Sequence, residues 1–183
     1  MTTILGISGS LRQGSLNTAL LRAAVGLMPA GATLDAEGIA GIPLYDGDAE
    51  AAHGIPPAVV RLKAKLAAAD GLLLVTPEYN NSIPGAFKNA IDWMTRPADD
   101  IARHFAGKPV AVIGASPGGF GTILAQDAWL PVLRTLGTRP WFGGRLMVSR
   151  AHTLLDAGGA LADQAIRDRL ADFLAGFVGF VRG

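Results

Sequence analysis

The chain has 183 residues, half of them hydrophobic, which suits one domain, residues 1–183, with a substantial core. Its formal net charge is +1 without a run of like charges, which argues against a nucleic-acid binder or a polybasic membrane anchor. Because cysteine is absent, disulfides, thiolate metal sites and a cysteine nucleophile are excluded.

The first apolar run, which begins at Ile4, changes abruptly to glycine, hydroxyl and arginine before a helical pattern starts. Apolar residues at three- and four-residue spacing predict an amphipathic helix over 16–28, with Ser15 as its N-cap. Loop 9–15 offers serine hydroxyls, the planar guanidinium of Arg12 and the free N–H groups of the helix start. The sequence therefore predicts a strand, an anion-binding loop and a helix.

The next segments predict a weak strand over 33–39 and a loop rich in turn formers over 41–48. A helix from Pro56 to near Asp70 follows, because proline suits the first helical turn and the apolar residues share a face. The apolar run 71–76 does not alternate with polar residues. It is typical of a strand buried on both faces, in the middle of a parallel sheet.

Two further loops follow buried strands in the same way. Loop 77–83 follows the strand at 71–76, and a helix over 86–94 and an irregular excursion over 96–107 come next. A buried strand over 109–115 then runs into the glycine-rich loop 116–121. Each of the three loops therefore lies after the carboxyl end of a strand.

The last third of the chain gives weaker signals. Pro131 removes a donor from the helix after residue 121, so we expect a kink or two segments. Residues 141–148 predict a last strand, with Gly143 and Gly144 as a bulge or slack point. Apolar residues on one face predict a C-terminal helix over 160–181.

Strand and helix alternate about five times, which favours an open parallel sheet with helices on both faces. In such sheets ligands bind beyond the carboxyl ends of the strands, where the strand order reverses. With a 2-1-3-4-5 order, loops 9–15, 77–83 and 116–121 converge at that point. This edge is the predicted ligand site.

The contents of the first loop limit the ligand. Gly9 and Gly14 have the spacing of a P-loop, but Ser15 stands where that motif needs lysine. Neither central strand ends in an aspartate that could bind magnesium, and the glycines do not follow the G-x-G-x-x-G order of dinucleotide-binding loops. A single phosphate therefore fits the loop best.

Three motifs at matching strand ends resemble the NADPH-dependent FMN reductase family, which includes bacterial chromate and quinone reductases and azoreductases. The resemblance covers roughly residues 2–150, and its motifs are Gly9-Ser10-Leu11-Arg12 with Ser15 and Asn17, Pro77-Glu78-Tyr79-Asn80 leading through Ile83-Pro84-Gly85 to Lys88–Trp93, and Ser116-Pro117-Gly118-Gly119. It implies a flavodoxin-like three-layer sandwich with a five-stranded parallel sheet of order 2-1-3-4-5.

The resemblance also implies a role for each loop toward flavin mononucleotide (FMN). The first would wrap the phosphate through Ser10, Arg12, Ser15, Leu16 and Asn17. The second would border the ribityl chain and the isoalloxazine ring through Pro77, Glu78, Tyr79 and Asn80. The third would meet the other edge of the ring through Ser116, Gly118 and Gly119. Many relatives carry leucine at the position of Phe87, a difference expected to affect packing under the loop more than chemistry.

In activity, the resemblance implies an NADPH- or NADH-dependent oxidoreductase that works by a ping-pong mechanism. Hydride passes from the nicotinamide to flavin N5 and then to a small acceptor such as a quinone, an azo compound, free flavin or a metal oxyanion. No catalytic side chain and no metal site is predicted. The resemblance further implies a homodimer or homotetramer, with 84–95 and 96–107 as contact surface. No apolar run is long enough to span a membrane and no basic segment precedes the first one, so we expect a cytoplasmic protein.

Two alternatives remain open from the residues. Gly114 to Gly118 fits the G-x-S-x-G nucleophile elbow of a serine hydrolase, with Ser116 as nucleophile and Asp127 and His152 following in hydrolase order. Against it, Pro117 lacks the backbone N–H that the oxyanion hole needs. The second alternative, a non-enzymatic electron carrier of flavodoxin type, would be expected to have a strongly charged docking surface.

The three histidines have no metal-binding spacing, and we expect surface or structural roles for them.

Overall fold

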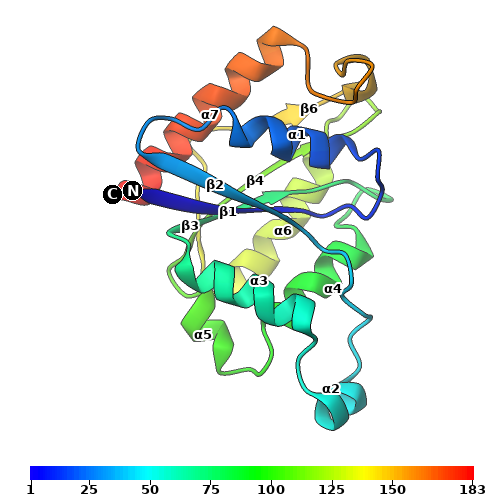
Figure 1. The fold of residues 1–183 in the computed structure, drawn as a ribbon, viewed down its shortest axis with the longest axis vertical. Coiled ribbons are helices and arrows are strands. Elements are labelled where there is room, and N and C mark those ends of the chain that lie inside the picture. The colour runs from blue at the N-terminus through cyan, green and yellow to red at the C-terminus, as the bar shows by residue number, and fades with distance from the viewer.

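The computed structural model describes residues 1–183 and contains a parallel sheet between two layers of helices (Figure 1). The strands run in the order β2-β1-β3-β4-β5, and a short strand β6 also pairs with β4. Their bounds are β1 Thr2–Ser8, β2 Ala32–Gly38, β3 Gly71–Val75, β4 Pro109–Ala115, β5 Arg139–Pro140 and β6 Met147–Val148. The predicted order and the flavodoxin-like layering are confirmed, and the sheet has one strand more than predicted.

Two apolar clusters, one on each face of the sheet, form the core. Helices α1 and α7 cover one face, and α3, α4 and α6 cover the other (Figure 1). The helices are α1 Leu16–Val25, α2 Gly47–His53, α3 Pro57–Ala68, α4 Gly85–Met94, α5 Asp100–His104, α6 Ile123–Thr135 and α7 Gln164–Arg182. Successive β3 residues point to opposite clusters, Leu72 and Leu74 to one and Leu73 and Val75 to the other. This explains the absence of alternation in the central strands.

Two short helices were missed. Helix α2 lies partly within the predicted loop 41–48 and beyond it, and it buries no residue, so it leaves no apolar period in the sequence. It is stabilised locally, because the Asp46 side chain accepts a hydrogen bond from Asp48 N at 2.9 Å. Helix α5 has five residues and lies in the predicted irregular segment 96–107. None of the helices combines the length and apolarity that crossing a bilayer requires.

The predicted last strand at 141–148 is wrong over 141–146, and only its last two residues form a strand, β6. Strand β5 ends at Pro140, and the chain leaves the sheet until β6 begins at Met147. The reason is Trp141, which packs edge-on against Phe173 of α7 at 4.9 Å between ring centroids. The chain then wraps around the indole, and a Cβ at Gly143 would come within 2.5 Å of Trp141 Nε1. Glycine here permits a close approach to the indole; it does not mark a bulge in a continuous strand.

Two helix expectations also change. Of the two outcomes expected at Pro131, a kink or a division into two segments, the division does not occur, because helix α6 continues across Pro131 as one element. Helix α7 begins at Gln164, four residues later than predicted, because Asp163 caps it by accepting a hydrogen bond from Ile166 N at 2.9 Å.

Candidate functional site

The three predicted loops leave the same edge of the sheet. Strands β1, β3 and β4 are parallel neighbours; the last residues of β1 and β3, Ser8 and Val75, lie in register, and β4 continues two residues past Ile113, the partner of Val75. The chain stays paired as the loops begin, since Gly9 N donates to Val75 O at 3.0 Å and Thr76 N donates to Ile113 O at 2.8 Å. Loops 9–15, 77–83 and 116–121 therefore start side by side, at the right of the sheet in Figure 1.

The first loop is a concentration of hydrogen-bond donors. Ser15 caps α1 by accepting from Thr18 N at 3.2 Å, as predicted, and Ser10 Oγ accepts from Arg12 N at 3.3 Å. The backbone N–H groups of residues 13–17 have no acceptor within the protein, and the exposed Arg12 guanidinium forms no ion pair. Together with the positive end of the α1 dipole, these groups suit an anion.

Asn17 lies beneath this loop, with only 4% of its surface exposed. Its Nδ2 donates to the backbone O of Ala115 at 2.9 Å, and its Oδ1 accepts from the backbone N of Ala115 at 2.9 Å. The side-chain amide is thus engaged by the end of β4, and the backbone N–H is the group of Asn17 that remains free. Asn17 therefore ties the start of α1 to the root of the third loop.

The loop also packs closely on α4. The fully buried ring of Phe87 lies directly against Gly9, where a Cβ would come within 2.0 Å of Phe87 Cδ1. Only glycine fits this contact without movement of the ring or the loop. Phe87 thus has the packing contact with a loop that was expected of it, here with the first loop.

The second loop is a tight hairpin turn. Tyr79 and Ser82 exchange two backbone hydrogen bonds, of 3.2 and 3.1 Å, around Asn80 at φ 51° and Asn81 at φ 62°. Two successive positive φ angles define a type I′ turn, and asparagine adopts them more readily than most residues. This stiff turn presents the half-exposed Tyr79 and the exposed Asn80 at the edge.

Glu78, in the same loop, is engaged by the next helix. Its Oε2 accepts a hydrogen bond from Ala125 N, in the first turn of α6, at 2.9 Å. The residue at the N-cap position, Thr122, makes no side-chain capping bond, so Glu78 supplies the cap from a distant part of the chain. A carboxylate there also complements the positive end of the helix dipole. Glu78 therefore ties the second loop to α6, the helix that follows the third loop.

The third loop is braced by the segment after β6. Ser116 N donates to Val148 O at 3.0 Å, Ala151 N donates to Ser116 O at 3.0 Å, and Arg150 N donates to Gly118 O at 2.9 Å. Gly118 and Gly119 are exposed, and their N–H groups have no acceptor in the protein. The loop also presents Phe120, whose side chain is 76% exposed.

Sequence reasoning missed two residues at this edge, Phe120 and Arg150. Phe120 could have been found, because it is an aromatic residue inside a glycine-rich loop at a strand end. Arg150 gives no signal of this kind, since only the pairing of β6 with β4 brings it to the third loop.

The structure does not assemble the hydrolase triad. Ser116 Oγ donates weakly to Gly118 O at 3.4 Å, within its own loop. Asp127 lies on α6 and lines a different hollow, and His152 is exposed in a short 3-10 helix. No hydrogen bond joins any two of the three side chains, so Ser116 has no base to activate it.

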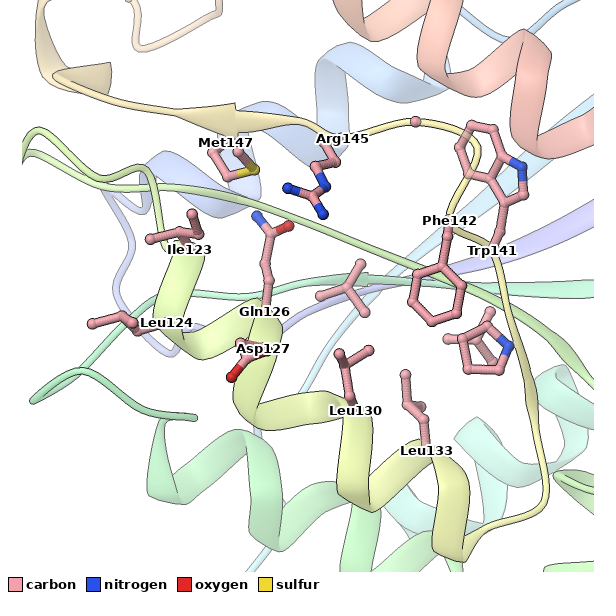
Figure 2. Close-up of a pocket in the computed structure, with 14 residues that line it drawn as sticks. Ile123, Leu124, Gln126, Asp127, Leu130, Leu133, Trp141, Phe142, Arg145 and Met147 are labelled. Carbon is pink, nitrogen blue, oxygen red and sulfur yellow. The ribbon is translucent and has the colours of Figure 1, made fainter.

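A separate hollow runs along α6, as Figure 2 shows. It has a volume of about 380 Å³ and lies between α6 and the segment that wraps from β5 to β6. Its lining is mainly apolar, with Gln126, Asp127 and Arg145 as the charged and amide groups. None of the predicted flavin-binding residues lines it. The donors that suit an anion are at the loop edge, and we therefore place the candidate site there.

A buried ionic cluster lies between α3 and α5, outside this site. Lys63 donates to the Asp100 carboxylate, and the pairing lowers the pKa of Asp100. His104 is buried, with its Nε2 3.8 Å from Asp100 Oδ2 and no partner for Nδ1. Burial lowers the pKa of His104 and so favours its neutral form, and the buried position agrees with the expected structural role.

Comparison with known proteins agrees with this geometry. The family model for NADPH-dependent FMN reductase matches residues 2–153, most of the chain and all three loops. The chain belongs to the NADPH-dependent FMN reductase family. It is 45% identical over 179 residues to an NAD(P)H-dependent FMN reductase of Pseudomonas aeruginosa, covering 98% of this chain and 95% of the relative.

Other members of the family have related names. A 2-hydroxy-1,4-benzoquinone reductase from a Burkholderia species is 36% identical, over 96% of this chain and 94% of its own. The solved structure of FerB, an NAD(P)H:acceptor oxidoreductase from Paracoccus denitrificans, is 35% identical with a TM-score of 0.86, covering 100% of this chain and 98% of that one. The predicted enzyme class and the predicted pairing of FMN with NADPH or NADH are those of the FMN reductase family. An electron carrier without enzymatic activity is thereby disfavoured.

Proposed function

We propose that this protein transfers electrons from NADPH or NADH through bound FMN to a small acceptor by a ping-pong mechanism. The observation that carries the proposal is the donor-rich first loop, in a chain of the FMN reductase family. When bound, FMN supplies the redox chemistry, accepting hydride from the nicotinamide and giving up electrons to the acceptor. The protein binds and orients the reactants.

The first loop would hold the FMN phosphate. The free N–H groups of residues 13–17, including those of Leu16 and Asn17, donate toward it, and Arg12 supplies a charged fork. The hydroxyls of Ser10 and Ser15 already accept backbone bonds, but each keeps its own proton for donation. These groups neutralise a dianion without the lysine and the metal that a triphosphate needs.

The other two loops would hold the ribityl chain and the ring. Pro77, Tyr79 and Asn80 border it on the rigid second turn, while Ser116, Gly118 and Gly119 meet its other edge. The two glycines bring free N–H groups close without a side chain between. The carboxylate of Glu78 is already engaged with Ala125 N. Glu78 would therefore contact the flavin through its backbone, and its side chain would hold α6 in place.

Flavin retention tests the phosphate assignment. The Arg12→Ala variant should lose FMN on gel filtration, whereas Arg22→Ala, an exposed arginine further along α1, should keep it. Flavin content is read from the visible spectrum. Equal FMN retention in both variants would count against Arg12 as a phosphate ligand, and a wild-type protein that cannot be reconstituted with FMN would overturn the proposed function.

Quinones are the first acceptors to test, because several relatives are named quinone reductases. With FMN bound, NADPH should bleach the flavin without a helper reductase, and a quinone should then restore its colour. An azo dye, free flavin and chromate complete the panel. Bleaching that requires a separate reductase would favour the electron-carrier alternative.

The homodimer or homotetramer also remains a proposal. The outer side of α4, in the predicted contact surface 84–95, carries the ion pair of Lys88 with Asp92, at 2.7 Å. Exposed apolar side chains gather instead along α6 and beside it, in Ile123, Leu124, Leu130 and Phe142 (Figure 2). Such a cluster is typical of an interface, so we add it to the proposed contact surface. Light scattering tests the assembly, and a monomer would refute it.

A cytoplasmic location likewise stays a prediction.

A further inference from the structure

Arg150 has an unusual backbone for its residue type. Four residues other than glycine have positive φ angles, and three of them have a local explanation. Asn80 and Asn81 form the type I′ turn, and the hydroxyl of buried Thr122 accepts from Gln126 Nε2 at 3.2 Å. Arg150, at φ 48° and ψ 34°, has no side-chain hydrogen bond to offset the strain of this conformation. Strained residues held by their surroundings occur disproportionately at functional sites.

The surroundings hold Arg150 against the third loop. Its N–H donates to Gly118 O, and its carbonyl accepts from Thr153 N at 3.0 Å and Thr153 Oγ1 at 2.9 Å. Two nearby residues bond to Ser116: Val148 O accepts from Ser116 N, and Ala151 N donates to Ser116 O. The Cα of Arg150 is therefore fixed beside the loop that would meet the edge of the flavin.

The side chain is a free cation. It is exposed and forms no ion pair. The backbone that carries it is bonded to Gly118, and the N–H groups of Gly118 and Gly119 are also free. The order β1-β3-β4 places the second loop between the first and the third. Arg12 lies in the first loop, whereas Arg150 is bonded to the third. The first-loop N–H groups and Arg12 would hold the one FMN phosphate without Arg150, which leaves the cation at the third loop without a partner.

We propose that Arg150 binds a phosphate of the nicotinamide dinucleotide substrate. This inference rests on the proposed function. A guanidinium forms bidentate hydrogen bonds with phosphate oxygens, and the glycine N–H groups beside it add donors. The phosphate is either the 2′-phosphate, which only NADPH carries, or the pyrophosphate, which NADPH and NADH share.

The variant Arg150→Gly tests the inference without a folding penalty, because glycine adopts this φ freely. Arg150→Lys keeps the charge but not the bidentate fork. Arg169→Ala, which removes an exposed arginine on α7, is the matched control. The FMN-loaded enzymes are assayed at a saturating quinone concentration, with NADPH and NADH varied separately.

We expect Arg150→Gly to raise the KM for NADPH about fivefold or more, with kcat, FMN content and melting temperature retained. Arg150→Lys should recover part of the loss, and the salt dependence of the KM for NADPH should weaken in Arg150→Gly. If the KM for NADH is unchanged, the ligand is the 2′-phosphate; if both KM values rise, it is the pyrophosphate.

An unchanged KM for both dinucleotides in Arg150→Gly, or an equal change in the Arg169→Ala control, would overturn the inference while leaving the proposed function intact. Failure of the wild-type holoenzyme to oxidise either dinucleotide would instead remove the proposed function itself. Binding of adenosine 2′,5′-bisphosphate and of adenosine 5′-monophosphate to the FMN-loaded enzyme gives a readout without turnover. If Arg150→Gly weakens binding of the bisphosphate only, the ligand is the 2′-phosphate; if it weakens binding of both, the ligand is the phosphate at the 5′ position, and no loss with either would overturn the inference.

Discussion

The two hydrogen bonds between Asn17 and Ala115 allow a sharp test of how the site is built. Asn17→Ala leaves the backbone N–H and C=O of Ala115 without partners at a buried position. Each unsatisfied buried group costs about 1–3 kcal/mol, so with two of them the variant should lose roughly 2–6 kcal/mol of unfolding free energy. For a chain of this size each kcal/mol lowers Tm by about 2–4 °C, which gives a fall of roughly 4–24 °C.

Asn89 provides a matched control. Its Oδ1 accepts from Tyr45 N and its Nδ2 donates to Pro43 O, both at 2.8 Å, but these bonds are exposed to solvent. Water can replace the lost partners in Asn89→Ala, so its loss should be about 1 kcal/mol or less.

The assay is urea unfolding of both variants, without FMN and with it. Equal losses in Asn17→Ala and Asn89→Ala would refute the reasoning from burial. If Asn17→Ala keeps its stability without FMN and loses only FMN affinity, the Asn17 amide binds the phosphate and does not serve as a tie between α1 and β4.

Three further predictions follow from contacts around the same edge and from the α3–α5 cluster. Gly9→Ala should cost about 1–3 kcal/mol through overpacking against Phe87, and adding Phe87→Leu should recover much of it; simple additivity in urea unfolding would argue against this contact. Glu78→Ala should lose about 1 kcal/mol of helix capping, whereas Glu78→Gln, which keeps an acceptor for Ala125 N, should lose less; equal melting temperatures for the two variants would contradict the capping role. The pKa of His104 is lowered in the fold, so the unfolded chain binds more protons as the pH falls below about 6.5, and stability should decline there. A His104→Asn variant, unfolded at pH 5 and pH 8, should lose this dependence, and an unchanged slope would assign it to another group.

The fold could be predicted because its signals are local and repeated. Apolar strands without alternation, such as 71–75, indicate burial on both faces, and helices between them require parallel neighbours. The elements that escaped prediction lack such signals. Helix α2 buries no residue and depends on the Asp46 cap. The sequence of segment 141–148 is typical of a strand, but the packing of Trp141 against Phe173 of α7 takes the chain out of the sheet.

The same distinction applies to the candidate site. The loops could be located from the sequence, since each follows a strand end. The contacts of their side chains could not be predicted, because the residues to which they bond are remote in the chain. Asn17 bonds to a residue 98 positions away, and Glu78 bonds to one 47 positions away. Neither contact leaves a periodic pattern.

These two long-range bonds have a consequence for motion. Asn17 joins the first loop to the end of β4, and Glu78 joins the second loop to α6, just beyond the third. Segments linked in this way open together, as one cooperative unit, more readily than one by one. The three loops would then exchange their amide protons with solvent as a single group, and a ligand that contacts only the first loop would protect the third as well.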